Sequence, residues 1–299
     1  MTVANEHQQA ASEVLAASES QDELALAAPA IKAMAPTPGR PWWRRALSVT
    51  IGPFVVFVIL LGAWYFITFV VLDPTRRFLM PAPQTVVHVA FFEHADLILL
   101  LKGLLVTTQA AMVGLAISIT FGVTVAIIMS EAKVLERGLF PYLVVLQTIP
   151  ILALVPLIGF WIGYGFTARV VVCILISVFP IMANTLFGLQ GYQSSYNELF
   201  SLHRVGRWKK LLKLKLPMAL PAMFTGFRIA AGLSVIGEIV GGFFFQRGQL
   251  DLGALLDEFT ARLNGPMLFG TVILASALGV AIFGLFSGVS ALVIGRWKE

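Results

Sequence analysis

The sequence is poor in charged residues and in cysteine. Only 12% of its residues are charged, about half of the roughly 25% that is usual in soluble domains. A single cysteine, Cys173, lies within an apolar run, which excludes an intramolecular disulfide and a thiolate metal site. The histidines also lack the spacing of metal ligands. They are His7, His88, His94 and His203.

Motifs for nucleotide hydrolysis and for catalysis are absent as well. The sequence has no G-x-x-x-x-G-K-[ST] phosphate loop, and it offers no nucleophile–base pair or metal cluster. We therefore expect neither enzyme activity nor a cofactor in this chain. We also expect no cleavable signal peptide, because the first apolar run extends for about 25 residues, longer than a signal core.

Long apolar segments are what the chain has instead. It is 58% hydrophobic, with a mean hydropathy of +0.86 and with 23 Phe and 26 Gly, as in closely packed helices in lipid. We predict an all-α integral membrane protein with six spanning segments. Pro150 and Pro156 in the third and Pro180 in the fourth predict kinked or broken helices there. The segments are 48–72, 104–130, 137–162, 168–190, 220–246 and 267–295.

Basic residues gather on one side of the predicted membrane. By the positive-inside rule, this side is cytoplasmic and includes both termini. Topology therefore accounts for the isoelectric point of about 9.5, and we expect no nucleic acid partner. The cytoplasmic residues are Arg40, Arg44, Arg45, Lys133, Arg137, Arg204, Arg207, Lys209, Lys210, Lys213, Lys215, Arg296 and Lys298, against Arg76, Arg77, Arg247 and Arg262 on the other side.

Three stretches lie outside the predicted spans. Residues 1–40 are rich in Ala, Glu, Ser, Gln and Pro without an apolar face, so we expect a disordered cytoplasmic tail. On the external side, residues 83–101 and 252–259 have helical spacing. These two either shield the bundle at the membrane surface or form a landing surface for an external protein. The apolar positions of the second are Leu252, Leu255, Leu256 and Phe259.

The segment from Ser195 to Pro221 is cationic and lies between two apolar runs. Ser195 and Glu198 have the spacing of a capping box, and Gly206 permits an elbow. We expect a short amphipathic helix after Gly206, ended by Pro217 and Pro221. Such a helix suits either a groove on another protein or an anionic membrane surface. Its expected apolar face comprises Trp208, Leu211, Leu212 and Leu216.

This segment resembles the cytoplasmic coupling motif of permease subunits in binding-protein-dependent ABC importers. Glu198 matches the motif's first Glu, Leu214 takes its Ile position, and Leu216-Pro217 matches its Leu-Pro end. The departures from the motif are Leu199 and Phe200 in place of two alanines, and Arg204 in place of the glycine, with Gly206 the nearest glycine.

Further motifs extend the resemblance over about residues 75–295. They are similar to those of the branch that handles nitrate, sulfonates, taurine and thiamine-precursor pyrimidines. In chain order they are Pro81-Ala-Pro83, Gln147-Thr148-Ile149-Pro150, Phe179-Pro180 with Asn184-Thr185, Leu216-Pro217-x-Ala219-Leu220-Pro221, and Gly226-x-Arg228-x-Ala230.

The resemblance implies a six-helix type I importer domain over residues 41–299, with a coupling segment at 195–217 between helices 4 and 5. It implies a dimer in the bacterial inner membrane, in contact with lipid, served by ATPase subunits that hold ATP-Mg and by an external binding protein. The solute is either a sulfonate- or nitrate-like anion or a vitamin-precursor heterocycle. The ATPase contacts implied are Glu198, Leu199, Leu202, Arg204, Gly206, Trp208, Leu212, Leu216 and Pro217.

Five polar residues within the spans are pathway candidates. Glu238 is the most conspicuous, because a charged side chain at the bilayer centre costs about 2.5–3.5 kcal/mol. It either lines the pathway or a gate, or forms hydrogen bonds to a neighbouring helix. The others are pathway ligands or interhelical contacts: Gln109, Gln147, Thr148 and Asn184. A secondary transporter is the alternative function, but it needs several intramembrane carboxylates or an unwound site.

Overall fold

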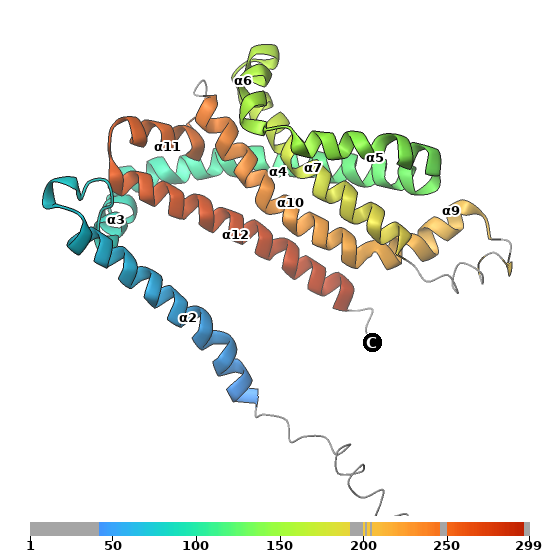
Figure 1. Cartoon of the computed structure of the whole chain (residues 1–299), viewed down its shortest axis with the longest axis horizontal. Coiled ribbons are helices and arrows are strands. Elements are labelled where there is room, and N and C mark those ends of the chain that lie inside the picture. Colours follow the sequence, from blue (N-terminus) through green and yellow to red (C-terminus); the bar gives the residue numbers. More distant parts are fainter. Residues whose placement is uncertain (1–41, 192–199, 201, 204, 246–249, 296–299) are drawn as a thin grey trace, which may run out of the picture. The chain divides into compact units, whose positions relative to one another are not determined.

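The structure is a computed structural model, and the residues it describes are 42–191, 200, 202–203, 205–245 and 250–295, with side chains from residue 51 onward. Every regular element in these ranges is a helix (Figure 1). The predicted all-α fold is therefore confirmed for the described part. The chain divides into two compact units, Met1–Ala63 and Trp64–Glu299. The predicted tail, residues 1–40, lies outside the described residues.

The first spanning segment is the helix α2 (Trp42–Phe66), which the π-helical turn η1 (Ile67–Val71) extends. From residue 51 onward it is long and apolar enough to cross a membrane. The helix begins before the expected start near residue 48. Hydropathy does not reveal where α2 begins, because its first turns contain arginines. Arginine is polar but a good helix former, so the helix extends beyond its apolar part.

The second segment is longer than predicted. The short elements η2 (Pro74–Arg76), α3 (Pro83–Val87) and η3 (His88–Phe92) precede α4 (His94–Glu131). Glu93 has an extended backbone (φ −78°, ψ 116°) and separates η3 from α4. The expected single helical stretch 83–101 and the expected start at residue 104 are therefore both wrong. The first turns of α4 contain polar residues, so hydropathy alone does not locate the start of this helix.

The third segment is a bent pair, α5 (Lys133–Thr148) and α6 (Ile151–Ile162), whose axes differ by 96°. Pro150 is extended and is the N-cap of α6. It has no N–H with which to continue the hydrogen bonds of α5, so the predicted break is confirmed there. The described part of the chain thus has five single helices that can cross a membrane, or six spans if the bent pair counts as one.

The helices α7 (Phe166–Gln190) and α10 (Leu216–Phe244) make the most extensive helix contact in the described part. A Cβ added to Gly226 would lie 2.8 Å from the Pro180 carbonyl oxygen. Glycine thus allows the two backbones to approach closely. Pro180 lies inside α7 without breaking it. Neighbouring atoms also lie close to Gly237, Gly241 and Gly242 of α10, whereas Gly232 faces open space.

The helix α10 lies at the centre of the larger unit, in contact with α4, α7 and α12 (Gly265–Gly295), and Figure 1 shows α12 alongside it. The predicted sixth segment, 267–295, is confirmed. Side chains of these four helices form the main apolar core, including Leu115, Ile181, Met223 and Ile282.

The helix α11 (Leu252–Ala261), which is predicted to lie on the external side, confirms the predicted helical spacing of its leucines. Asp251 caps it by accepting a hydrogen bond from the Ala254 N–H at 2.8 Å. Leu252, Leu255 and Phe259 are buried in a second apolar cluster with residues of η3, α4 and α12. The apolar face of α11 therefore packs on the bundle, and a landing surface for an external protein stays a prediction.

Candidate functional site

The bundle has two ends at which charged residues meet. The Lys215 end contains Glu131 of α4, Gln190 of α7 and Lys215, which precedes α10. The Asp251 end contains Arg169 of α7, Glu238 of α10 and Asp251. Because α10 connects the two ends, a movement at one can reach the other.

The described part of the coupling segment lies at the Lys215 end. Glu198, Leu199 and Arg204, with the predicted capping box, lie outside the described residues. Gly206 is the N-cap of α9 (Arg207–Lys210), and the Lys210 N–H donates to its carbonyl at 3.1 Å. Its backbone is extended (φ −62°, ψ 152°). The chain turns into a helix here, but any residue can adopt this conformation, so the turn does not require glycine.

The predicted apolar face of the coupling helix divides into two. Leu211 and Leu214 are buried, 3% and 6% exposed, whereas Trp208 and Leu212 are 75% and 61% exposed; Leu202 is exposed too. The prediction of a single face was wrong because residues 211–215 form a π-helical turn, η4, which has a wider repeat than an α-helix. The buried leucines anchor the segment, and the exposed pair is open to a partner.

Pro217 and Pro221 do not end the helical run, contrary to expectation. The elements α9, η4 and α10 form one continuous run, Arg207–Phe244, with Pro217 in the first turn of α10 and Pro221 inside it. The Leu216 N–H still bonds to the Leu211 carbonyl, five residues back. A π turn changes the hydrogen-bond register, so the missing N–H of Pro217 falls where the ladder is already shifted.

An ion pair holds the base of the coupling segment against α4. Lys215 Nζ lies 2.7 Å from Glu131 Oε1, with the lysine side chain 11% exposed and the carboxylate 31%. Exposed pairs contribute little to stability, typically below about 1 kcal/mol. The pair therefore sets the position of the segment more than it stabilises the fold.

A groove of about 420 Å³ contains two of the predicted pathway residues, Gln147 and Asn184. The break between α5 and α6 contributes Ile149 and Ile151, and the remaining walls come from α7 and α10. Among the residues that the structure describes, every side chain that lines the groove is uncharged. Backbone that leaves the helical conformation within a membrane is tolerated where it is buried in protein or lines a water-filled cavity, which fits the position of this break.

The other two uncharged candidates lie elsewhere. Thr148 is exposed, and its hydroxyl donates to the Val145 carbonyl at 2.8 Å. Gln109 is exposed on α4 and does not line the groove. Their roles in the pathway stay predictions.

Glu238 lies in a buried charge cluster and is not among the residues that line the groove. Arg169 forms an ion pair with Asp251, and its Nη1 atom lies 3.9 Å from Glu238 Oε1. The two carboxylates are 0% exposed and the arginine 2%. The Leu252 N–H also donates to the Thr107 hydroxyl at 3.0 Å, which connects the cluster to α4. The cluster thus ties α11 to α4, α7 and α10, and a role for Glu238 in the pathway stays a prediction.

Sequence reasoning missed Arg169 and Asp251. A cation within an apolar span needs a partner, and the next predicted segment contains the carboxylate Glu238, which makes it a candidate partner of Arg169. Asp251 directly precedes the periodic leucines of α11, the position of a helix N-cap. No signal in the sequence predicts that the side chains of Arg169, Glu238 and Asp251 meet.

Comparison with known proteins places these features in a family. Residues 118–298 match the family described as binding-protein-dependent transport system inner membrane component. The chain is 31% identical to the formylaminopyrimidine transport permease protein of Halalkalibacterium halodurans, over 83% of this chain and 96% of that protein.

Two further relatives have similar identities. The chain is 28% identical to the riboflavin transport system permease protein of Chloroflexus aurantiacus, over 82% of this chain and 89% of that one. It is 32% identical to the bicarbonate transport system permease protein of Synechococcus elongatus, over 54% and 69%. The chain belongs to this family and is a membrane-spanning permease subunit of a binding-protein-dependent ABC importer.

Proposed function

We propose that this permease carries a small, uncharged nitrogen heterocycle through a pathway formed by two copies of the chain. The groove that contains Gln147 and Asn184 is the part of the pathway that contacts the solute. Separate ATPase subunits hold and hydrolyse ATP-Mg, and an external binding protein delivers the solute. The importer lies in the bacterial inner membrane, with both termini and the coupling segment in the cytoplasm.

The chemistry of the groove is the observation that carries the choice of solute. Its polar side chains are the carboxamides of Gln147 and Asn184, each of which both donates and accepts hydrogen bonds. The rest of the lining, such as Phe179, is mostly apolar. A mostly apolar wall with a few polar groups fits a small organic ring. An anion would leave its charge without a cationic partner there.

The helix ends at the groove favour the same solute. The C-terminus of α5 and the N-terminus of α6 meet at Ile149 and Pro150. Their dipoles present partial charges of opposite sign. A ring that carries both donors and acceptors can use both ends, whereas a simple anion can use only one.

The relatives support a heterocycle as well. Two relatives that match over more than four fifths of this chain are named for formylaminopyrimidine and riboflavin, both nitrogen heterocycles. The permease named for bicarbonate matches over only 54%.

The exposed residues at the Lys215 end support coupling to an ATPase. Trp208 and Leu212 project from a helix that the buried Leu211 and Leu214 anchor. Two exposed apolar side chains four residues apart on a helix are suited to a groove on another protein. The basic residues nearby favour the cytoplasmic side for this end, by the positive-inside rule.

A second copy of the chain would complete the groove. Ile229 and Ile236 of α10 line it and are 45% and 53% exposed. In a dimer these side chains would face the other copy across the pathway. Glycine-supported packing of α7 against α10 provides a rigid wall on the protein side.

Uptake by a reconstituted importer tests the proposal. The chain is reconstituted into liposomes with its ATPase subunits and binding protein, and ATP-dependent uptake is measured for formylaminopyrimidine, riboflavin, nitrate, taurine and bicarbonate. We expect uptake of a heterocycle. The double substitution Gln147→Leu and Asn184→Leu should lower it by about 25-fold, roughly fivefold for each lost hydrogen bond.

The matched control is Gln109→Leu, which removes the same type of side chain outside the groove and should leave uptake within twofold of the wild type. Uptake of an anion without any heterocycle would contradict the proposed solute. Exchange of solute by liposomes that hold this chain alone would instead indicate a secondary transporter.

A further inference from the structure

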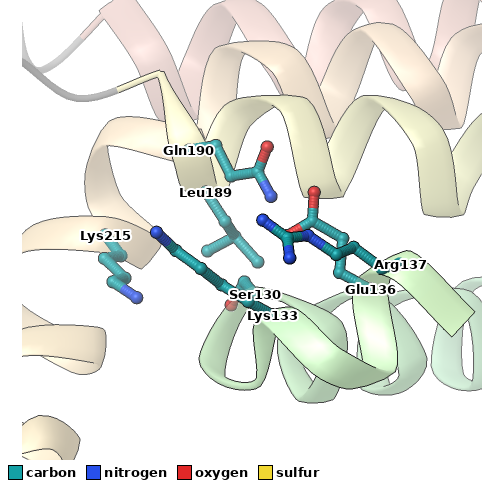
Figure 2. Close-up of a pocket in the computed structure, with 7 residues that line it drawn as sticks. All are labelled: Ser130, Lys133, Glu136, Arg137, Leu189, Gln190 and Lys215. Carbon is teal, nitrogen blue, oxygen red and sulfur yellow. The ribbon is translucent and has the colours of Figure 1, made fainter.

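A second pocket, of about 360 Å³, lies at the Lys215 end, on the side of the bundle where α5 begins. Figure 2 shows Lys133 and Arg137 extending from α5 toward the end of α7, with Lys215 entering from a separate helix. We call it the cationic pocket. Its polar lining comprises Ser130, Lys133, Glu136, Arg137, Gln190 and Lys215.

The lining of the cationic pocket has an excess of positive charge. It contains three cations and one carboxylate, Glu136. The ammonium of Lys215 is held by Glu131. Within the described part of the chain, the ion pairs include neither Lys133 nor Arg137. Two cations on adjacent turns of α5 therefore face a cavity large enough for a phosphate group.

We propose that the cationic pocket binds the phosphate group of an anionic phospholipid. The guanidinium of Arg137 matches the geometry of phosphate oxygens, and Lys133 adds a second charge. Basic pockets between transmembrane helices on the cytoplasmic side are suited to anionic head groups. The inference concerns a lipid site outside the solute pathway and does not depend on which solute is carried.

The surface next to the pocket decides between a lipid and a soluble phosphate compound. Phe140 and Val144 follow Arg137 at spacings of three and seven residues, on one face of α5. Both side chains are exposed, by 43% and 41%. This face leads from the pocket along the apolar length of the helix. A phospholipid can use both parts, the phosphate at the cations and an acyl chain along Phe140 and Val144.

A bound head group would connect α5 to the base of the coupling segment. Lys133 and Arg137 belong to α5, whereas Lys215 ends η4 and is already tied to Glu131 of α4. A phosphate between them would hold these elements in one arrangement. We therefore expect anionic lipid to support the geometry on which coupling depends.

Lipid retention by the purified full-length chain tests the site. The chain is titrated in detergent with radiolabelled phosphatidylglycerol and, separately, with phosphatidylcholine, and the retained lipid is measured. We expect the wild type to prefer phosphatidylglycerol. Lys133→Gln with Arg137→Gln should weaken its binding by about 25-fold, roughly fivefold per charge. Glu136→Gln should strengthen it, because it removes the only carboxylate among the lining residues that the structure describes.

The matched control is Lys209→Gln with Lys213→Gln, which removes two cations from the same membrane side outside the pocket. Binding by this variant should stay within twofold of the wild type. Equal losses in the two double variants would overturn the site, because they would indicate general attraction to an anionic surface. Equal retention of the two lipids by the wild type would overturn it as well.

Two further measurements distinguish a lipid site from a site for soluble phosphate and from a purely structural role of the cations. Inorganic phosphate at millimolar concentration should not displace phosphatidylglycerol, and displacement would assign the pocket to soluble phosphate compounds instead. The helices α4 and α7 both end at this pocket. A purely structural role of the cations would be to neutralise the partial negative charge of the terminal carbonyl groups of these helices. In that case, the Lys133 and Arg137 substitutions would lower the Tm while leaving the preference for phosphatidylglycerol unchanged, and the proposal would fail.

Discussion

The two ends of the bundle hold their charged side chains differently. At the Asp251 end, Arg169 and two carboxylates are enclosed by four helices and almost completely removed from solvent. At the Lys215 end, the pair of Lys215 and Glu131 is partly exposed and borders a cavity. One end is sealed around its charges, and the other leaves its charges within reach of a partner.

This difference indicates different tasks for the two ends. A buried ion pair fixes geometry, because separating its members leaves a charge in a medium that cannot solvate it. A partly exposed pair costs little to rearrange. The Asp251 end is therefore suited to hold α11 in place, and the Lys215 end to adapt to other molecules.

The largest expected effect is at the sealed end. Arg169→Met leaves the carboxylates of Glu238 and Asp251 buried without their cation, so we expect a loss of about 3–5 kcal/mol of stability. The Tm of the purified chain in detergent measures this loss.

Neutralising the whole cluster provides the control. The triple variant with Arg169→Met, Glu238→Gln and Asp251→Asn removes the stranded charges and should recover much of the lost stability. A single Arg169→Met variant as stable as the wild type would show that the cluster does not hold this end together.

The second effect separates anchoring from docking at the Lys215 end. Leu211→Asp places a charge at a buried position and should destabilise the chain by about 3 kcal/mol. Leu212→Asp, one residue further at an exposed position, should leave the Tm unchanged and abolish solute uptake in the assembled importer. Normal uptake with Leu212→Asp would show that the exposed pair Trp208 and Leu212 does not form the surface that contacts the ATPase.

A third effect lies between the two ends, at the contact of α7 with α10. Gly226→Ala places a methyl group 2.8 Å from the Pro180 carbonyl oxygen, so the helices must separate, at a cost of about 1–3 kcal/mol. Gly232→Ala meets no atom within 4 Å and should be neutral or slightly stabilising, because alanine favours the helix. Equal Tm values for the two variants would contradict close packing at Gly226.

The smallest expected effect is loss of the partly exposed ion pair between Lys215 and Glu131. Lys215→Gln should lower the stability by less than about 1 kcal/mol, and high salt should reduce the difference further. A drop in Tm as large as that of Arg169→Met would mean that the two ends are equally rigid.

The sequence predicts the helices well where one physical signal dominates. Apolar length locates the spans, and Pro150 marks the break between α5 and α6 because it lacks an N–H. Helix ends are predicted poorly, since α4 continues past its apolar part to His94. Pro217 misleads for a different reason, because the π turn before it is not visible in the pattern of residue types.

The candidate sites divide in the same way. Gln147 and Asn184 are found from their motifs, and the structure brings them to one groove. The cluster of Arg169, Glu238 and Asp251 depends on the packing of three elements, which no local pattern determines. The exposure of Trp208 and Leu212 also required the structure, because the sequence pattern puts both on one apolar face with Leu211, which is buried.

The uninterrupted run from Arg207 to Phe244 has a mechanical consequence. Its 38 residues correspond to roughly 55 Å at the usual rise of 1.5 Å per residue, more than the full thickness of a bilayer with its head groups. Without a loop to absorb motion, a push or twist at Trp208 is carried along the whole rod to the opposite membrane surface. Conformational changes on the two faces of the membrane would then be coupled through this one helical run.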